Sequence, residues 1–240
     1  MAEELNIPHE LATLIFGKDN ILLKDQGKIF HIYGEAGTGK TTLALQIALS
    51  YCIKDKRVFY LDTEGKITGS KLKEMSDGNN FKIINKNLKF FIINKFEEQQ
   101  KLIQKLDYFF QTQKVDMIIV DTITNHYRQA MLFQKDAKNL YEKLAFQVAN
   151  LNKIAKKKFI PILLINQATM RKQKSELEEG ETVALERIDP VAKAIMSYWS
   201  DKEIILINHG WGKFEARIPR EYEGRVKFSI NEKGIAPYKE

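Results

Sequence analysis

The sequence GEAGTGKT at residues 34–41 has the residue types and the spacing of a phosphate-binding loop. Glycines in this pattern let backbone N–H groups turn toward phosphate oxygens, and the helix that follows points its positive end at the same anion. We expect the Lys40 ammonium to reach the β- and γ-phosphates of a bound nucleotide, and the Thr41 hydroxyl to bind Mg²⁺. The predicted nucleotide-binding residues of this region are Gly34, Glu35, Ala36, Gly37, Thr38, Gly39, Lys40, Thr41 and Thr42.

A carboxylate that could complete the magnesium site follows a second apolar run. Asp121 comes directly after the four apolar residues 117–120. At the exit of a buried strand, its carboxylate would hold Mg²⁺ through the water shell, opposite Thr41. Asp is also common at strand ends as a turn or cap residue, but the phosphate-binding loop upstream favours the metal role.

Two further strand ends carry groups suited to the hydrolysis of a nucleoside triphosphate. Glu64 could orient and deprotonate a water in line with the γ-phosphate. Asp62 as the base, or a purely structural Glu64, are the alternatives. The Gln167 amide both donates and accepts hydrogen bonds, so it could sense the γ-phosphate or the attacking water and pass its presence to the segment that follows.

These residues need a scaffold that brings distant strand ends together. Short β-branched and aromatic runs alternate with amphipathic stretches, which is typical of an α/β fold with a mostly parallel twisted sheet and helices on both faces. Ligands of such sheets bind beyond the carboxyl ends of the strands. We predict strands at 28–33, 57–62, 90–93, 116–121 and 159–165. We predict helices after the phosphate-binding loop, at 102–113 and at 140–151. A short helix through Leu72 and Met75 should end at a turn at 77–80. Runs at 204–207, 213–218 and 225–230 predict an antiparallel C-terminal extension.

Length and composition indicate one globular domain. The chain has 240 residues, 44% hydrophobic and 29% charged, with 5 prolines and no Gly/Ser-rich linker. We predict a short N-terminal segment at 1–25 and a single domain at 26–240. No stretch approaches the roughly 18 apolar residues of a membrane span, and the acidic start is unlike a signal peptide, so we expect a cytoplasmic protein without membrane contact. The single cysteine, Cys52, excludes disulfides and cysteine-cluster metal sites.

The charge balance points to an acidic partner. A formal net charge of +7 favours nucleic acid, although solvated lysine-rich helix surfaces explain much of the excess equally well. We predict a mobile charged loop at 168–189, which carries four basic and six acidic side chains and no aromatic residue to stack a base. Because only Arg171, Lys172 and Lys174 suit phosphate contact there, we expect modest, strongly salt-dependent affinity for DNA.

Several motifs together carry a family resemblance. YLDTEG at 60–65, IIVDTIT at 118–124 and INQ at 165–167 resemble, in order and spacing, the core motifs of RecA-family recombinases, above all those of the archaeal and eukaryotic branch. The match covers most of the chain, and its short N-terminal part resembles an archaeal paralogue of the family. The resemblance implies a RecA-like P-loop NTPase fold, ATP and Mg²⁺ as ligands, slow hydrolysis at best, and DNA binding in homologous recombination and repair.

Other residues depart from that family's pattern. Lys71 stands where the recombinases place an arginine against the adenine, and lysine lacks the planar group for stacking. About 25 residues before the first predicted strand are too few for the N-terminal DNA-binding domain of full recombinases. After Tyr127 the chain continues toward helix without the Gly-Arg-Gly pattern of the first DNA-binding loop, so we do not expect strand exchange. Arg128 follows the strand that ends at Asp121 and is a candidate for contact with DNA or a neighbouring subunit, and a surface ion pair is the alternative.

Three functions fit these observations. The first is an ATP-binding, DNA-binding accessory factor of recombination with weak hydrolysis, whose partners would be single- or double-stranded DNA, a full-length recombinase or another repair protein, and further copies of itself. The second is a signalling or scaffold ATPase that resembles the KaiC branch of the same superfamily and does not act on DNA. The third is an ATP-binding interaction module without turnover. The charge of +7 favours the first, and the acidic segment 168–189 favours the other two.

Overall fold

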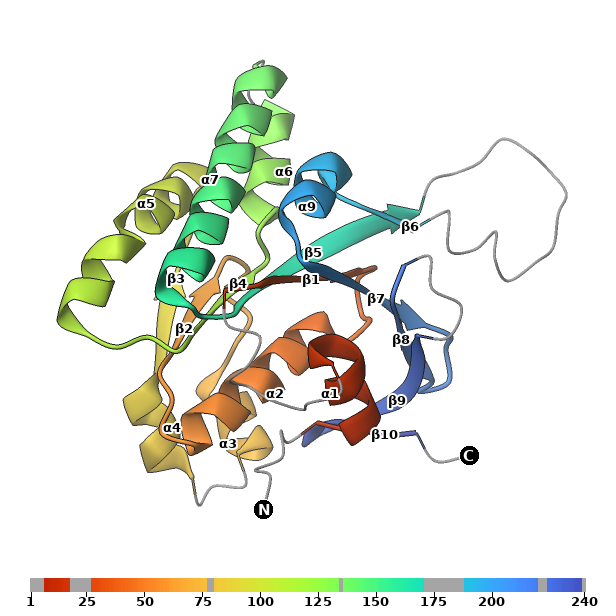
Figure 1. Cartoon of the computed structure of the whole chain (residues 1–240). Helices are drawn as coiled ribbons and strands as arrows, with labels where there is room; N and C mark the ends of the chain where they lie inside the picture. The colour runs from red at the N-terminus through yellow and green to blue at the C-terminus, as the bar shows by residue number, and fades with distance from the viewer. Residues whose placement is uncertain are drawn as a thin grey trace, which may run out of the picture.

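One twisted sheet lies at the centre of the protein, with helices on both of its faces (Figure 1). The computed structural model describes residues 7–17, 27–76, 80–133, 136–170, 188–219 and 224–238. Within these ranges the strands follow the order β10-β9-β8-β7-β1-β5-β4-β2-β3, and β6 pairs with β5 beside that path. The predicted α/β fold with an antiparallel C-terminal extension is confirmed.

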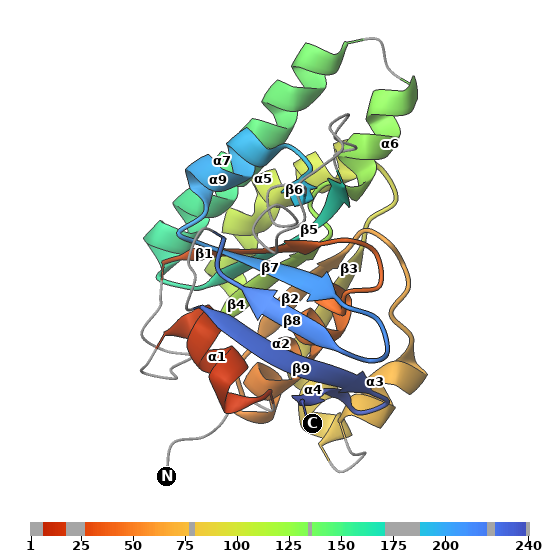
Figure 2. The ribbon, with the colours of Figure 1, turned by 90° about the vertical axis from the view of Figure 1, so that its right-hand side faces the viewer.

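The strands from β7 to β3 in this order are parallel to one another. They are β7 (Lys202–Asn208), β1 (Ile29–Gly34), β5 (Ile162–Met170), β4 (Met117–Asp121), β2 (Val58–Asp62) and β3 (Leu88–Ile92). Antiparallel pairing joins β7 to β8 (Phe214–Arg217), β8 to β9 (Arg225–Asn231), β9 to β10 (Gly234–Pro237), and β5 to β6 (Ile188–Pro190). Figure 2 shows how the antiparallel strands continue the sheet.

The central strands are apolar on both faces, because each face packs against a layer of helices. In β4, Met117 and Ile119 contribute to the core shared with α2 (Lys40–Ile53). Ile118 and Val120 contribute to the opposite core, which contains side chains of α5 (Phe96–Thr112), α7 (Ala137–Lys158) and α9 (Lys193–Trp199). The near-continuous hydrophobic runs of the sequence therefore reflect a sheet enclosed on both sides.

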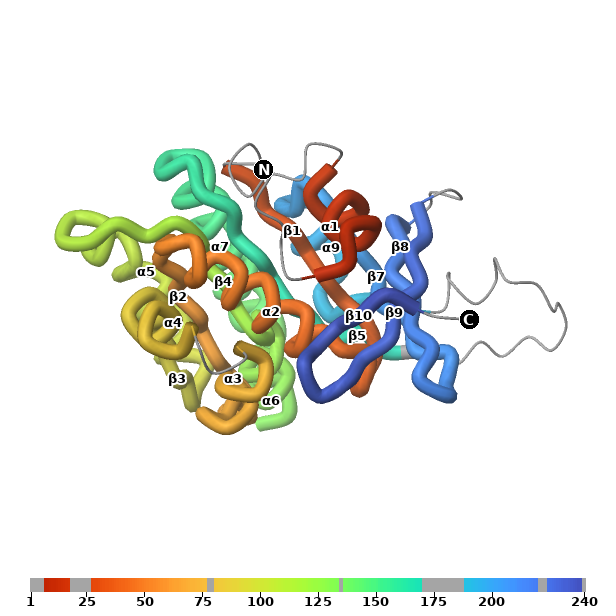
Figure 3. Tube along the Cα trace, turned by 90° about the horizontal axis from the view of Figure 1, so that it is seen from below, coloured from red at the N-terminus to blue at the C-terminus, as the bar shows by residue number. Residues whose placement is uncertain are grey.

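Helix α2 is more completely buried than its sequence predicts. Its periodicity indicates one wide apolar face, yet every residue from Thr42 to Cys52 is buried. The reason is that α4 (Phe81–Asn87) and β10 pack against it in addition to the sheet (Figure 3). The Gln46 amide Nε2 donates to the Ile235 carbonyl at 3.1 Å, and the Ile235 N–H donates to Gln46 Oε1 at 2.7 Å. A side chain of α2 thus pairs with the backbone of β10.

Several elements were not predicted from the sequence. Helix α1 (His9–Phe16) belongs to the core, where the Phe16 and Phe30 ring centroids lie 5.1 Å apart. Helix α4 follows the predicted turn at 77–80, and α9 and β10 were also missed, whereas the short helix α3 (Gly69–Met75) was expected. The helix expected after Tyr127 is α6 (Asn125–Phe133).

Two predicted boundaries around β5 are wrong. The strand begins at Ile162 rather than at 159, because Phe159 caps the end of α7 in the left-handed conformation, with φ 53°. At the other end, β5 continues through Ala168, Thr169 and Met170, where a mobile loop was predicted, because these residues pair with β6. Residues 171–187 of the predicted loop lie outside the described residues.

No helix in the described parts of the chain combines the length and the apolar character that a membrane crossing requires.

The link between α2 and β10 gives a first prediction. Gln46→Met keeps the side-chain volume close to that of glutamine but leaves the buried N–H and C=O of Ile235 without these partners. We expect the free energy of unfolding to fall by about 2–4 kcal/mol in urea denaturation. The matched control is Gln104→Met on the exposed side of α5, which should change it by less than about 0.5 kcal/mol. Equal stability of the two variants would contradict a structural role for this link.

Candidate nucleotide-binding site

Strand register brings the predicted site residues to one edge of the sheet. Gly34 at the end of β1 is level with Gln167 of β5, and Asp62 at the end of β2 is level with Asp121 of β4. Asp121 is in turn level with Ile165, two residues before Gln167. Four segments that are far apart in sequence therefore meet at their carboxyl ends, where ligands of such sheets bind.

The phosphate-binding loop connects β1 to α2, and two of its glycines are required by its surroundings. A Cβ atom on Gly34 would lie 2.3 Å from the Leu206 carbonyl oxygen of β7. Gly39, the N-cap of α2, has φ 85°, and a Cβ atom there would lie 2.4 Å from Ile230 Cδ1 of β9. The loop thus passes close to the backbone of β7 on one side and to a side chain of β9 on the other.

Lys40 points back into this loop. Its ammonium donates to the Gly34 carbonyl at 2.9 Å, to the Glu35 carbonyl, and to Thr38 Oγ1 at 3.3 Å. Burial lowers the pKa of Lys40 to about 8, although the carboxylates of Asp121, Glu64 and Glu35 act in the opposite direction. The ammonium is thus held at the loop by neutral oxygens, and the phosphate oxygens of a nucleotide would provide stronger, charge-assisted acceptors.

Asp121 is a buried carboxylate with incomplete hydrogen bonding. The Tyr60 hydroxyl donates to its Oδ2 at 2.7 Å, whereas Oδ1 is buried and has no hydrogen-bond partner among the described residues. Burial raises the pKa of Asp121 to about 6, the polar side chains of Tyr60 and Thr41 lower it, and the nearby Glu64 and Asp62 raise it further. The carboxylate would be stabilised by a cation at this position.

The residues present fit a hydrated Mg²⁺ bound together with a nucleotide. The free Oδ1 of Asp121 and the adjacent Thr41 hydroxyl are hard oxygen donors of the kind that Mg²⁺ prefers. Across the described parts of the chain, no group of three or more His, Cys, Asp or Glu side chains could hold a metal ion. A Mg²⁺ here would therefore complete its octahedral shell with phosphate oxygens and water, as is usual for this ion.

Glu64 stands on a short turn that Asp62 builds. Asp62 Oδ1 accepts hydrogen bonds from the backbone N–H groups of Glu64 at 2.9 Å and of Gly65 at 2.8 Å. Asp62 is 3% exposed, so its carboxylate is occupied as a structural acceptor. Of the two carboxylates considered for the general base, the geometry favours Glu64 and gives Asp62 the role of positioning it.

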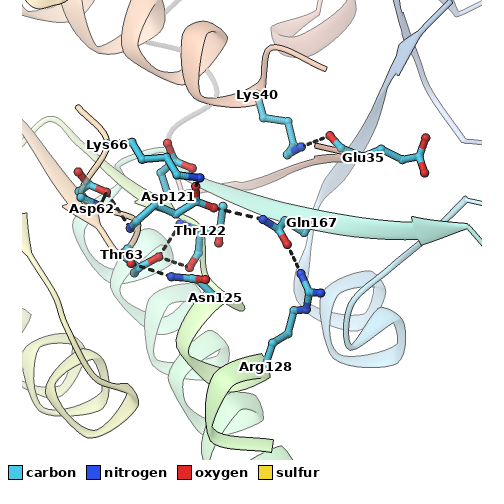
Figure 4. Close-up of polar contacts among 12 residues, drawn as sticks. Glu35, Lys40, Asp62, Thr63, Lys66, Asp121, Thr122, Asn125, Arg128 and Gln167 are labelled. Carbon is cyan, nitrogen blue, oxygen red and sulfur yellow. Dashed lines mark hydrogen bonds and ion pairs between the residues drawn. The ribbon is translucent and has the colours of Figure 1, made fainter. Parts of the chain in front are cut away.

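A chain of polar contacts runs through Glu64 to helix α6. Lys66 Nζ lies 2.7 Å from Glu64 Oε2, and Gln167 Nε2 donates to Glu64 Oε1 at 3.2 Å. Arg128 Nη1 of α6 donates to Gln167 Oε1. Figure 4 shows Gln167 between the Asp121 strand end on one side and Arg128 on the other. Gln167 therefore connects the candidate base to an exposed arginine.

The ends of β2 and β4 are joined by a second set of hydrogen bonds behind these residues. Thr63 Oγ1 donates to the Thr122 carbonyl at 3.0 Å, and the Thr122 N–H donates to Thr63 Oγ1 at 2.9 Å. Asn125 Nδ2 of α6 donates to the Thr63 carbonyl at 2.7 Å. These contacts fix Asp121 and the Glu64 turn relative to each other and to the start of α6 (Figure 4).

For the remaining predicted site residues, the structure gives little information about function. Thr42 is buried in the first turn of α2. Lys71 lies in the first turn of α3, where its backbone N–H donates to the Thr68 side chain at 3.3 Å. The three candidate DNA contacts of the acidic segment, Arg171, Lys172 and Lys174, lie outside the described residues.

Two residues of this site were missed from the sequence. Lys66 was overlooked because a lysine two residues after a glutamate is common on surfaces, and only the turn at Asp62 makes the two side chains meet. Tyr60 was noted as part of an apolar strand and of the YLDTEG motif but without a role, and its register beside Ile119 of β4 brings its hydroxyl to Asp121. The signal that could have identified Tyr60 is the alternation of side chains between the two faces of β2, combined with the order of the strands in the sheet.

The chain is similar to known proteins over most of its length. The family model described as Rad51 matches residues 19–237. The chain is similar to the DNA repair and recombination protein RadB of Methanocaldococcus jannaschii, at 30% identity over 88% of this chain and 93% of the relative. It is similar to the proteins of the same name from Thermococcus gammatolerans (32% identity, 88% of this chain and 90% of the relative) and Pyrococcus furiosus (27% identity, 95% and 96%).

Burial of Asp121 gives a prediction about stability and pH. Its folded pKa of about 6 lies above the ordinary value of 3.8, so the folded protein binds this proton more tightly than the unfolded chain does. Ionisation therefore costs stability as pH rises through this interval. Asp121→Asn should raise the free energy of unfolding by about 1–3 kcal/mol at pH 7.5 without metal or nucleotide. The gain should shrink as pH falls toward about 4. Denaturation at several pH values in EDTA measures it, and a variant less stable than wild type at pH 7.5 would contradict the assignment.

Proposed function

The chain belongs to the Rad51 family, and on that premise we propose that it is an ATP-binding, DNA-binding accessory protein of homologous recombination and DNA repair, with weak ATP hydrolysis. The observation that carries the proposal is the meeting of Lys40, Asp121, Glu64 and Gln167 at one edge of the sheet. The names of the archaeal relatives support a role in recombination over that of a scaffold ATPase without DNA.

The nucleotide would bind with its phosphates in the loop from Gly34 to Thr41. Lys40 is already directed into that loop, and its ammonium would exchange neutral carbonyl acceptors for phosphate oxygens. Thr41 and Asp121 would hold Mg²⁺, which neutralises phosphate charge and orients the triphosphate. The dipole of α2 would also stabilise the phosphates, because the helix begins at Lys40 and its positive end lies at the loop.

Glu64 would orient the attacking water and accept its proton. The contacts of Glu64 support slow turnover, because both of its carboxylate oxygens have partners, Lys66 on one and Gln167 on the other. A water would have to replace one of these contacts before it could be activated.

Gln167 would carry the nucleotide state to the DNA-binding surface. Its side chain bonds both Glu64 and Arg128, and its backbone carbonyl accepts from the Val191 N–H at 3.0 Å. A γ-phosphate that draws the amide toward itself would weaken the contact with Arg128. Arg128 is exposed, and it would then be available to DNA or to a partner such as a full-length recombinase or a second copy. Coupling of this kind must be reciprocal between ATP and DNA.

The first test is DNA binding with ATP and Mg²⁺ present. We expect a fluorescent single-stranded oligonucleotide to bind at about 50 mM salt, with an affinity that falls steeply as salt rises, because phosphate contacts release counterions. Anisotropy titrations with and without ATP measure both the salt slope and the coupling. Absence of binding at about 50 mM salt would overturn the DNA-binding part of the proposal and favour a scaffold ATPase.

The second test separates catalysis from binding. Glu64→Gln should lower the rate of phosphate release at least about 100-fold while ATP affinity stays within about threefold of wild type, because only proton transfer is lost. Lys40→Ala is the contrasting variant, and it should weaken both ATP binding and turnover. Steady-state phosphate release and nucleotide titration provide the measurements. Wild-type turnover in Glu64→Gln would remove Glu64 from the role of general base.

A further inference from the structure

Trp211 is the most exposed large hydrophobic side chain among the described residues. It lies at the tip of the hairpin between β7 and β8, and its relative exposure is 99%. Leu206 of β7 is level with Gly34, so the tip projects beyond the sheet edge that carries the phosphate-binding loop. Figure 2 shows β7 and β8 side by side, with their connection at the outside of the molecule. An indole in this position contributes nothing to the core.

The turn that presents this indole is well defined. Gly210, Trp211 and Gly212 all have positive φ, at 80°, 53° and 75°. The turn is closed by hydrogen bonds from the Gly210 N–H to Asn208 Oδ1 at 2.8 Å and from the Lys213 N–H to the Gly210 carbonyl at 2.9 Å. A left-handed conformation is unfavourable for a bulky residue, and so is a solvated indole. Left-handed backbone at a bulky, fully exposed residue is typical of sites where the side chain has a function, and we infer that the ring contacts a partner.

The surroundings of the ring are mainly cationic. In the described part of residues 208–238, the exposed charged side chains are Lys213, Arg225, Lys227 and Lys233, which are positive, and Glu232, which is negative. A further carboxylate there, Glu215, is buried and paired with Arg217 and His209. An exposed aromatic ring among mainly cationic side chains is the arrangement by which proteins bind single-stranded nucleic acid.

We propose that the 208–213 hairpin is a binding site for single-stranded DNA, in which Trp211 stacks on an unpaired base while Lys213 and Lys227 contact the flanking phosphates. Stacking on an indole requires a base whose face is accessible, which double-stranded DNA does not offer. The inference rests on the proposed DNA-binding function and adds a site that lies outside the segment 168–189. It places DNA next to the edge of the sheet where the nucleotide would bind.

A second copy of the chain suits this feature less well. One indole provides a small contact area, whereas a stable protein interface buries at least about 1,200 Å² in total. Two copies would also bring like-charged surfaces together, at +7 each. A polyanion such as DNA would instead be attracted by the same positive charges.

The experiment uses Trp211 as its own reporter. The chain has two tryptophans, so Trp199→Phe leaves Trp211 as the only indole. With ATP and Mg²⁺ at about 50 mM salt, we expect oligo(dT) to quench this fluorescence saturably, at the same concentrations at which anisotropy reports binding. ATP and Mg²⁺ without DNA should leave the emission unchanged.

Affinity measurements provide the second readout. Trp211→Ala should weaken oligo(dT) binding at least about fivefold, and Trp211→Phe should restore most of it, because the aromatic face is what stacks. Phe159→Ala is the matched control, because Phe159 is also an exposed aromatic with φ 53° but lies at the end of α7. The DNA affinity of Phe159→Ala should not change. The ATP affinity should stay unchanged in all of these variants.

Two results would overturn the inference while leaving the proposed function intact. One is unchanged oligo(dT) affinity in Trp211→Ala with no quenching of Trp211. The other is a loss of self-association in sedimentation with unchanged DNA affinity, which would assign the ring to a contact between copies. If the wild-type protein bound no DNA at all, the proposed function would fail together with this site.

Discussion

The candidate site depends on keeping two opposite charges almost out of water at the edge of the sheet. Burial lowers the pKa of Lys40 to about 8 and raises that of Asp121 to about 6, so each group is less stable in its charged form than it would be in solvent. The attraction of Asp121 opposes the shift of Lys40 without cancelling it, and hydrogen bonding to Tyr60 opposes the shift of Asp121 in the same way. The two buried charges are therefore unfavourable on their own, and a polyanion bound with a divalent cation would stabilise both.

That arrangement accounts for the close contacts around the two charged groups. A charged group stays desolvated only if the backbone around it cannot relax toward water. The loop is confined by Leu206 at Gly34 and by Ile230 at Gly39, and the Asp121 strand end is tied to Thr63 and Asn125. By contrast, the groups proposed to respond to a nucleotide are the more exposed ones. Lys66 and Arg128 are exposed, and their contacts with Glu64 and Gln167 cost little to rearrange.

Local patterns were enough to predict the site residues that the structure brings together, because each belongs to a short motif at the end of an apolar run. Gly34 to Thr41, Asp121, Glu64 and Gln167 are of this kind. What the sequence did not reveal depends on partners that are distant in sequence. The extension of β5 past Gln167 requires β6, almost twenty residues later, and the full burial of α2 requires α4 and β10. Helices α4 and α9, at seven residues each, show no clear helical period, whereas the equally short α3 was predicted through Leu72 and Met75.

The C-terminal strands act on the phosphate-binding loop as well as extending the sheet. Ile230 of β9 packs on Gly39 at the N-terminus of α2, and Ile235 of β10 pairs with Gln46 almost two turns further along the same helix. These two contacts hold α2 from one side, while the parallel strands hold it from the other. The orientation of α2 at the loop from Gly34 to Thr41 thus depends on residues near the end of the chain. The hairpin with Trp211 joins β7 to β8, and β8 pairs with β9, so a ligand bound there would act on a part of the structure already connected to the candidate nucleotide site.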